Sequence, residues 1–345
     1  MRGTTKKLLA AAALATAVVT ATGGTGAADP TSLPAARDIV GVGDGVTQLV
    51  MNQLSADYNA TIPSTDTTTP RLYSWDATGT SPITTKTGAT SIARPNGADA
   101  GIQALKNNTS TAVDFARSSR GPALTDPNTF EFVAFASDGV SWAAKSGGNA
   151  PANLTTQNLK DIYTCNVTTW DQIDPSLPST TIKPFLPQPG SALRTNFLWK
   201  IGVSAFGLCV TEGVQENEGS DAQLNDPDAL VPYSVGHYVG QMYYDRGSGS
   251  DVQGPLTIRN VNGDAPVDTA KKAINKNFVG GSYVLSLYHV LRRSDWNAAA
   301  AHGAALRSVF GADGWICTNP TALADITGFG FLPLPPHACG SITHS

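Results

Sequence analysis

The feature that most constrains this chain is a repeated alternation of short apolar runs with stretches of helical spacing. An apolar run at 39–43 leads into a glycine loop, and apolar residues then recur every three or four positions through 46–58. The pattern returns with a run at 72–75, a helical stretch at 98–106 and another run at 112–116. Alternating strands and helices favour a mainly parallel sheet flanked by helices, so the sequence predicts an α/β fold.

The second half of the chain continues this alternation. A chain of 345 residues is long enough for two domains, each with its own core. Two apolar strands, at 130–135 and 140–144, are placed to carry the chain from the first domain into the second. Further on we expect a hydroxyl-capped helix at 154–163, a strand at 181–186 before a helix carrying Phe197, a strand at 282–290, and an Ala-rich helix at 296–310.

The first 28 residues read as a secretory signal peptide. Basic residues at positions 2, 6 and 7 precede an apolar run from Leu8 to Val19, which is too short to span a bilayer. Small residues follow, and cleavage is expected after Ala27 or Ala28. No cysteine stands at this junction to carry a lipid, so we expect a secreted or extracytoplasmic protein that is soluble and has no lipid anchor.

Charge and motifs exclude several function classes. The net charge is −4, and three of the cations lie in the predicted leader, which argues against a nucleic-acid partner. The sequence contains no Gly-x-Ser-x-Gly elbow, no His-Glu-x-x-His and no Gly-x-x-x-x-Gly-Lys. The five histidines are expected to lie away from the loops discussed below, which leaves no obvious general base. We therefore expect no enzyme activity, no cofactor and no metal.

Several segments, in this order and spacing, carry a family resemblance. They are Gly41-Val42-Gly43, Val113-Asp114-Phe115, residues 154–170, Pro189-Gly190-Ser191, residues 233–236 and residues 330–335. With them the chain resembles the phosphate-binding family of periplasmic solute receptors that serve ABC importers, in particular its Gram-positive branch. The resemblance implies a type II periplasmic-binding-protein-like fold with two crossovers. It implies a discontinuous first lobe, 29–130 with 280–345, and a second lobe, 131–279.

The four cysteines are expected to form disulfides in an oxidising compartment. Three pairings are formally open. We favour Cys165 with Cys209 and Cys317 with Cys339, because each bridge then closes a loop within one lobe. A bridge between the lobes would hinder their closure.

The resemblance also implies where a ligand binds. Members of this family hold their anion by hydrogen bonds from loops and helix N-termini, where free N–H groups and the helix dipole favour negative charge. Four loops qualify: 43–47, 97–101, 117–120 and 190–195. The candidate ligand-binding residues in them are Asp44, Gly45, Thr47, Ala98, Asp99, Arg117, Ser118, Ser119, Gly190, Ser191 and Arg194.

This chain departs from the family in all four loops. Asp44 stands where a hydroxyl is common, and such a carboxylate repels a dianion unless it is protonated or turned away. Ala98 and Asp99 replace a Ser-rich pattern, Ser119 replaces an Asp that accepts a proton from phosphate, and Leu193 replaces a hydroxyl. Arginines near the loops can compensate for the lost hydroxyls, because a guanidinium offers a planar set of donors that suits a tetrahedral oxyanion. We expect Arg194, beside Ser191, to supply the surviving charged contact, so that Arg194→Ala weakens anion binding at least tenfold.

Together these observations predict an exported, monomeric solute-binding protein. It is expected to capture a small oxyanion, phosphate above all, for an ABC importer whose membrane subunits are its partners. One alternative is an extracellular binding or adhesion module that keeps the fold with altered or lost anion binding. Another is an exported hydrolase that uses a pair of carboxylates.

Overall fold

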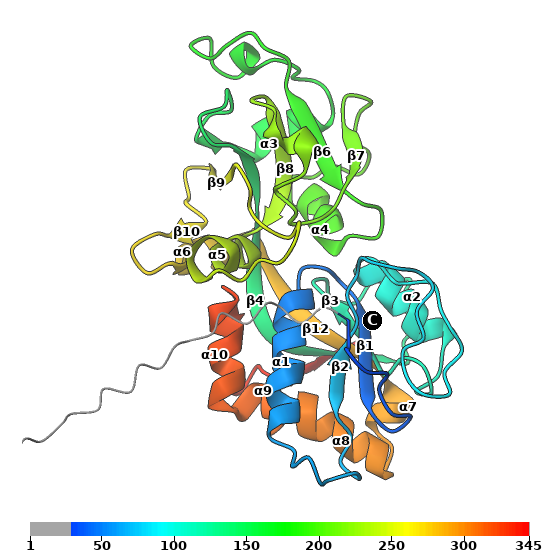
Figure 1. Ribbon diagram of the computed structural model, residues 1–345. Coiled ribbons are helices and arrows are strands. Elements are labelled where there is room, and N and C mark those ends of the chain that lie inside the picture. Colours follow the sequence, from blue (N-terminus) through cyan, green and yellow to red (C-terminus); the bar gives the residue numbers. More distant parts are fainter. Residues whose placement is uncertain (1–28, 345) are drawn as a thin grey trace, which may run out of the picture.

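The computed structural model describes residues 29–344. They form two lobes, one above the other in Figure 1, joined through the long strand β4 (Phe130–Lys145) and the strand β12 (Val284–Arg292). The predicted lobe boundaries fall near the starts of these two strands. A 12-stranded sheet runs through this part of the chain, with the main strand order β2-β1-β3-β12-β4-β8-β6-β7. The predicted leader lies outside the described residues.

The first lobe begins with the alternation that the sequence predicts. Strand β1 pairs in parallel with β2 and β3, and antiparallel β12 follows next to β3. Strands β13 and β14, from the C-terminal end of the chain, pair with β4. The elements are β1 (Ile39–Gly43), α1 (Gln48–Ala60), β2 (Leu72–Ser74), α2 (Ala98–Asn107), β3 (Phe115–Ser118), α7 (Arg293–Trp296), α8 (Ala301–Phe310), α9 (Trp315–Thr318), α10 (Pro320–Gly328), β13 (Leu332–Pro333) and β14 (Ile342–Thr343).

The second lobe is built around the strands β8, β6 and β7. Strand β6 pairs in parallel with both β8 and β7, whereas β8 and β9 run antiparallel to β4. Its elements are β5 (Asn153–Leu154), α3 (Thr156–Tyr163), β6 (Lys183–Pro187), α4 (Ala192–Lys200), β7 (Thr211–Val214), β8 (Ala229–Ser234), α5 (Val235–Tyr244), β9 (Leu256–Val261), β10 (Val267–Asp268), β11 (Ala273–Ile274) and α6 (Lys276–Val279), with short 3₁₀ helices at Trp170–Gln172 and Ala222–Asn225. Thr155 caps α3 through its hydroxyl, as the sequence predicts.

Two predicted elements differ from the structure. The strands expected at 130–135 and 140–144 are one 16-residue strand, β4, because Asp138 between them is buried and pairs like its neighbours. The helix expected at 296–310 begins later, as α8 at Ala301, and Trp296 is instead the last residue of the short helix α7. The chain turns at Asn297, and Gly303 in the first turn of α8 packs closely against the carbonyl oxygen of Ala298, where an added Cβ would lie 2.3 Å away.

The disulfide prediction is confirmed. Cys165 is bonded to Cys209 in the second lobe, and Cys317 is bonded to Cys339 in the first. Neither bridge crosses between the lobes. Within the described residues, no helix is both long and apolar enough to cross a membrane.

Candidate anion-binding site

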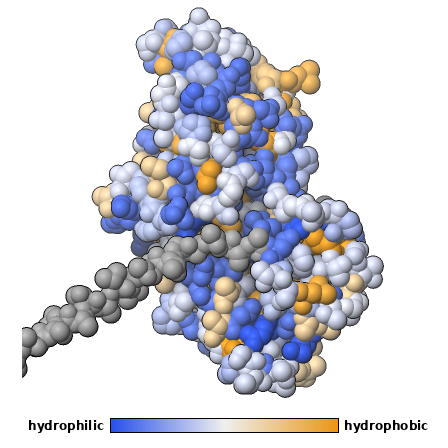
Figure 2. All heavy atoms as spheres, in the orientation of Figure 1, coloured by the Kyte–Doolittle hydropathy of each residue, from blue (hydrophilic) through white to orange (hydrophobic). Residues whose placement is uncertain are grey.

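The four loops proposed from the sequence meet at the boundary between the lobes. The loop after β1 contacts the loop after β3, because the hydroxyl of Ser119 donates to a carboxylate oxygen of Asp44 at 3.0 Å. The loop before α2 contacts the loop before α4, because the backbone N–H of Asp99 donates to the carbonyl oxygen of Gly190 at 3.3 Å. A waist marks this boundary in the space-filling view (Figure 2).

Asp44 is fully buried in the loop between β1 and α1. Besides Ser119, the hydroxyl of Thr47 donates to its carboxylate at 3.3 Å. Burial, reinforced by the nearby carboxylate of Glu216, raises the pKa of Asp44 from 3.8 to about 8. At neutral pH this side chain is therefore largely a protonated acid, able to donate one hydrogen bond and accept others.

Arg117 supports the loops from within the first lobe. Its buried guanidinium donates to the carbonyl oxygens of Gly43 and Asp44, each at 3.0 Å, and to the hydroxyl of Ser74 at 2.6 Å. A further hydrogen bond goes to the carbonyl oxygen of Trp75 at 2.7 Å. Burial lowers the pKa of Arg117 to about 10. These four hydrogen bonds all lie within the first lobe, so in this conformation Arg117 acts on the site through its charge and through the shape of the Asp44 loop.

Ser191 is the N-cap of α4. Its hydroxyl oxygen accepts the backbone N–H of Arg194 at 3.2 Å, which is the usual capping bond. The same hydroxyl donates to Oε2 of Glu216 at 2.5 Å. The prediction that Ser191 stands at the start of this helix is confirmed.

Glu216 is the residue of this site that the sequence analysis missed. It follows β7 in the second lobe, and its Oε1 accepts the backbone N–H of Gly45 in the first lobe at 2.9 Å. We define the Gly45 backbone N–H and the Ser191 hydroxyl together as the anion seat, since both donate to this one carboxylate. Burial raises the pKa of Glu216, and the hydrogen bond from Ser191 partly opposes that rise. The only signal in the sequence is an acidic residue in a polar loop directly after a strand.

The remaining predicted residues lie around this centre. Ala98 begins α2, and the carboxylate of Asp99 pairs with Arg120 at the rim at 2.7 Å. Arg120 also pairs with Asp126 at 2.7 Å. The hydroxyl of Ser118 donates to the carbonyl oxygen of Arg120 at 2.8 Å and so shapes the loop.

The structure places the guanidinium of Arg194 away from the anion seat. It donates to the carbonyl oxygen of Pro187 at 3.0 Å and pairs with Glu212 on β7 at 2.5 Å. Its carbon atom Cζ lies 5.1 Å from the centre of the Phe206 ring. The role predicted for Arg194 as a ligand therefore requires this side chain to turn, and it stays a prediction.

Other polar contacts join the lobes beside the anion seat. Asn96 of the first lobe exchanges side-chain amide hydrogen bonds with Gln215 of the second, at 2.9 and 3.2 Å, and accepts one from the amide of Gln188 at 3.0 Å. The side-chain amide of Asn196 donates to the carbonyl oxygen of Ser119 at 3.0 Å. The lobes are thus in contact across the cleft.

His237 corrects the expectation that all histidines lie away from the loops. It is buried at the start of α5, with Nδ1 3.1 Å from the carbonyl oxygen of Val46 and Nε2 2.5 Å from Asp251. Burial disfavours the charged ring, but Asp251 outweighs burial and raises the pKa of His237. Both ring nitrogens are occupied, so His237 joins the lobes rather than presenting a free base.

A cavity of about 150 Å³ adjoins the Glu216 side chain. It is lined by polar residues from both lobes, among them the acidic side chains Asp76, Glu216, Glu218 and Asp251. Among the described residues, no group of three or more His, Cys, Asp or Glu side chains is arranged to hold a metal ion. The cavity beside Glu216 is therefore polar and acidic.

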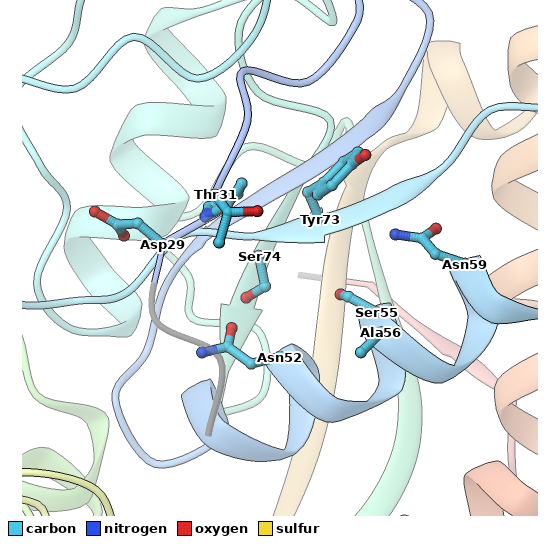
Figure 3. Close-up of a pocket in the computed structure, with 9 residues that line it drawn as sticks. Asp29, Thr31, Asn52, Ser55, Ala56, Asn59, Tyr73 and Ser74 are labelled. Carbon is cyan, nitrogen blue, oxygen red and sulfur yellow. The ribbon is translucent and has the colours of Figure 1, made fainter. Parts of the chain in front are cut away.

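A second cavity, of about 190 Å³, lies within the first lobe between α1 and β2. Figure 3 shows Asn52, Ser55 and Asn59 on α1, with Tyr73 and Ser74 on the neighbouring strand. The residues that line this cavity do not include those of the four loops. It is a separate feature from the anion seat.

Several solved structures share this architecture. A solved structure described as an ABC-type phosphate transport receptor from Vibrio cholerae is 19% identical, with 86% of this chain and 100% of that chain covered and a TM-score of 0.57. One described as a putative phosphate ABC transporter substrate-binding protein with bound phosphate, from Clostridium perfringens, is 15% identical, with 86% and 100% covered and a TM-score of 0.60. A phosphate-binding protein from Stenotrophomonas maltophilia is 13% identical, with 87% and 91% covered and a TM-score of 0.53.

At these identities the likeness establishes the fold, which is that of the type II periplasmic binding proteins. Among curated proteins, none matches this chain in sequence. Residues 20–288, which are most of the chain, match the PBP superfamily domain. This chain therefore belongs to the PBP superfamily.

Proposed function

We propose that this protein is an exported solute-binding protein that captures a small oxyanion, phosphate first among them, between its lobes for an ABC importer. The observation that carries the proposal is the anion seat, where Gly45 and Ser191 already hold two oxygens of one carboxylate. A tetrahedral oxyanion offers the same pair of acceptors. The related solved structures support the choice of ligand, since they are described as phosphate receptors and one holds phosphate.

The protonation of Asp44 is compatible with this ligand. A doubly charged anion would be repelled by two ionised carboxylates, but the raised pKa of Asp44 leaves it largely uncharged near neutrality. In that state it donates a hydrogen bond to an oxyanion, and after losing its proton it accepts one from a protonated ligand. The buried charge of Arg117, on the adjoining strand, also favours an anion.

The test is equilibrium dialysis of phosphate-free protein against labelled phosphate, with sulfate, arsenate and acetate as competitors. We expect saturable phosphate binding that Ser191→Ala weakens at least tenfold, because a hydrogen bond to a charged group contributes about 1.5–3 kcal/mol. Thr155→Ala is the matched control. It removes the N-cap of α3, far from the cleft, and should leave the affinity unchanged. Equal affinities of wild type and Ser191→Ala would remove the anion seat from the binding site.

A second candidate is an extracellular binding or adhesion module that has lost its anion. The observation that favours it is the pair of buried carboxylates, Asp44 and Glu216, facing the same small space. This candidate predicts that none of the four anions binds between pH 5 and pH 9. Saturable binding of any of them, sensitive to Ser191→Ala, contradicts it.

We propose a monomer that is released outside the cytoplasmic membrane without a lipid anchor and that docks on the membrane subunits of an importer. Light scattering on purified protein measures the oligomeric state. Fractionation of the producing cell measures the location, and a membrane-bound mature form would contradict this part of the proposal.

A further inference from the structure

The carboxylate of Glu216 occupies the place where an oxyanion is proposed to bind. Its main chain belongs to the second lobe, where its N–H donates to Oε1 of Gln188 at 2.9 Å. Its side chain reaches a backbone N–H of the first lobe that lies 171 residues away in sequence. The residue is 3% exposed, so solvent does not compete for either hydrogen bond. One carboxylate thus satisfies donors on both sides of the cleft.

The fit around this carboxylate is tight. A Cβ on Gly45 would lie 2.7 Å from Oε1 of Glu216, so a side chain at position 45 would push the carboxylate out of its present position. Hydrogen bonds to a carboxylate are roughly twice as strong as those between neutral groups. The contact is therefore stronger than each of the neutral amide and backbone contacts that also join the lobes.

We infer that Glu216 is a tethered carboxylate that occupies the anion seat, holds the lobes closed in the absence of ligand, and has to be displaced before an oxyanion binds. The cavity beside Glu216 gives the displaced side chain room to move without unfolding its loop. Glu216 would then set both the affinity and the ligand class. A weak anion fails to displace it, whereas a ligand with more oxygens than a carboxylate can do so.

This inference predicts a penalty on ligand affinity. When the binding-competent form is only a fraction of the population, the apparent dissociation constant rises by the inverse of that fraction. Glu216→Gln keeps the shape of the side chain and removes its charge, so we expect phosphate to bind at least tenfold more tightly to this variant. Glu131→Gln is the matched control. Glu131 is also buried, lies on β4 and pairs with Arg293 outside the four loops, so its substitution should change the affinity less than twofold.

The closure itself is measured without any ligand, by small-angle X-ray scattering of phosphate-free protein. We expect wild type to be compact and to shrink little on addition of phosphate. Glu216→Ala should have a larger radius of gyration, which falls when phosphate is added. A wild type that is open without phosphate, or a ligand-free Glu216→Ala as compact as wild type, would overturn the closure by Glu216.

The two halves of the experiment separate this inference from the proposed function on which its affinity part rests. If Glu216→Ala opens and no variant binds any oxyanion, closure by Glu216 stands and the proposed function fails. If wild type and Glu216→Gln bind phosphate with equal affinity, the Glu216 carboxylate and phosphate do not compete for the anion seat, and the displacement of Glu216 is refuted. Tighter binding by Glu216→Gln together with opening of Glu216→Ala supports both.

Discussion

Replacing Asp44 by asparagine should make the protein more stable at high pH and change its stability little at low pH. Asp44 is buried without a formal ion pair, and its pKa rises from 3.8 to about 8 on folding. Between about pH 4 and pH 8, Asp44 therefore keeps its proton in the folded state and loses it in the unfolded state. For such a group the stability is fully present below about pH 4 and is lost progressively as the pH rises to about 8.

The size of this loss follows from the shift. Each unit of pKa difference corresponds to about 1.4 kcal/mol, so the loss has an upper limit on the order of 6 kcal/mol. The groups that face Asp44 are Glu216 after β7, Arg117 and Ser119 at the end of β3, and Thr47 before α1. The carboxylate of Glu216 raises the pKa, whereas the other three lower it. An asparagine at position 44 keeps an acceptor for Ser119 and carries no charge.

The assay is denaturant unfolding of wild type and Asp44→Asn from pH 4 to pH 9. We expect the two curves of unfolding free energy to lie close together at pH 4 and to separate with rising pH, the variant being more stable by a few kcal/mol at pH 8. Asp99→Asn, whose carboxylate is about half exposed at the rim, is the control and should show no such separation. Parallel curves for wild type and Asp44→Asn would refute the buried proton.

Three further predictions concern the cleft and the disulfides. Arg194→Ala should weaken phosphate binding at least tenfold, because the guanidinium can leave Glu212 and turn toward the bound anion; calorimetry measures the affinity, and a change of less than twofold would remove Arg194 from the site. Gly97→Ala should keep the lobes apart in scattering, because the new Cβ would lie 2.4 Å from the carbonyl oxygen of Gly190; an unchanged radius would contradict this contact. Replacing Cys317 and Cys339 together by serine should lower the unfolding free energy by about 3 kcal/mol, measured in urea, and an unchanged midpoint would contradict it.

The sequence predicts the local elements well because the apolar residues that face the core recur at the spacing of a helix or a strand. The apolar spacing after β1 gives α1 and the hydroxyl before Ala192 gives the start of α4, both within a few residues. The disulfide pairing was predictable because a bridge between the lobes would hinder their closure, so each bridge was expected within one lobe. The four candidate loops meet because they follow strands or precede helices at one edge of each lobe.

What the sequence does not predict depends on contacts between distant segments. Glu216 lies in a polar stretch without periodicity, and its partner Gly45 becomes its neighbour only when the lobes close. The position of Arg194 in the first turn of α4 is as predicted, but its direction depends on Glu212, which a parallel strand pairing brings alongside. Neither contact leaves a pattern in the nearby residues.

Strand β4 has a mechanical consequence for the way such a cleft can open. It is one continuous strand shared by both lobes. Strand β12 pairs with it, and the register of this pairing shifts between Leu287 and Tyr288. The carboxylate of Asp138, in the middle of this strand, accepts a hydrogen bond from the backbone N–H of Gly236 at 2.7 Å and so holds the first turn of α5 against β4. Any rotation of one lobe against the other has to twist this two-stranded ribbon and pull α5 with it. Helix α5 also holds His237 against the carbonyl oxygen of Val46 in the first lobe. Bending of the ribbon and opening of the cleft are therefore coupled through α5.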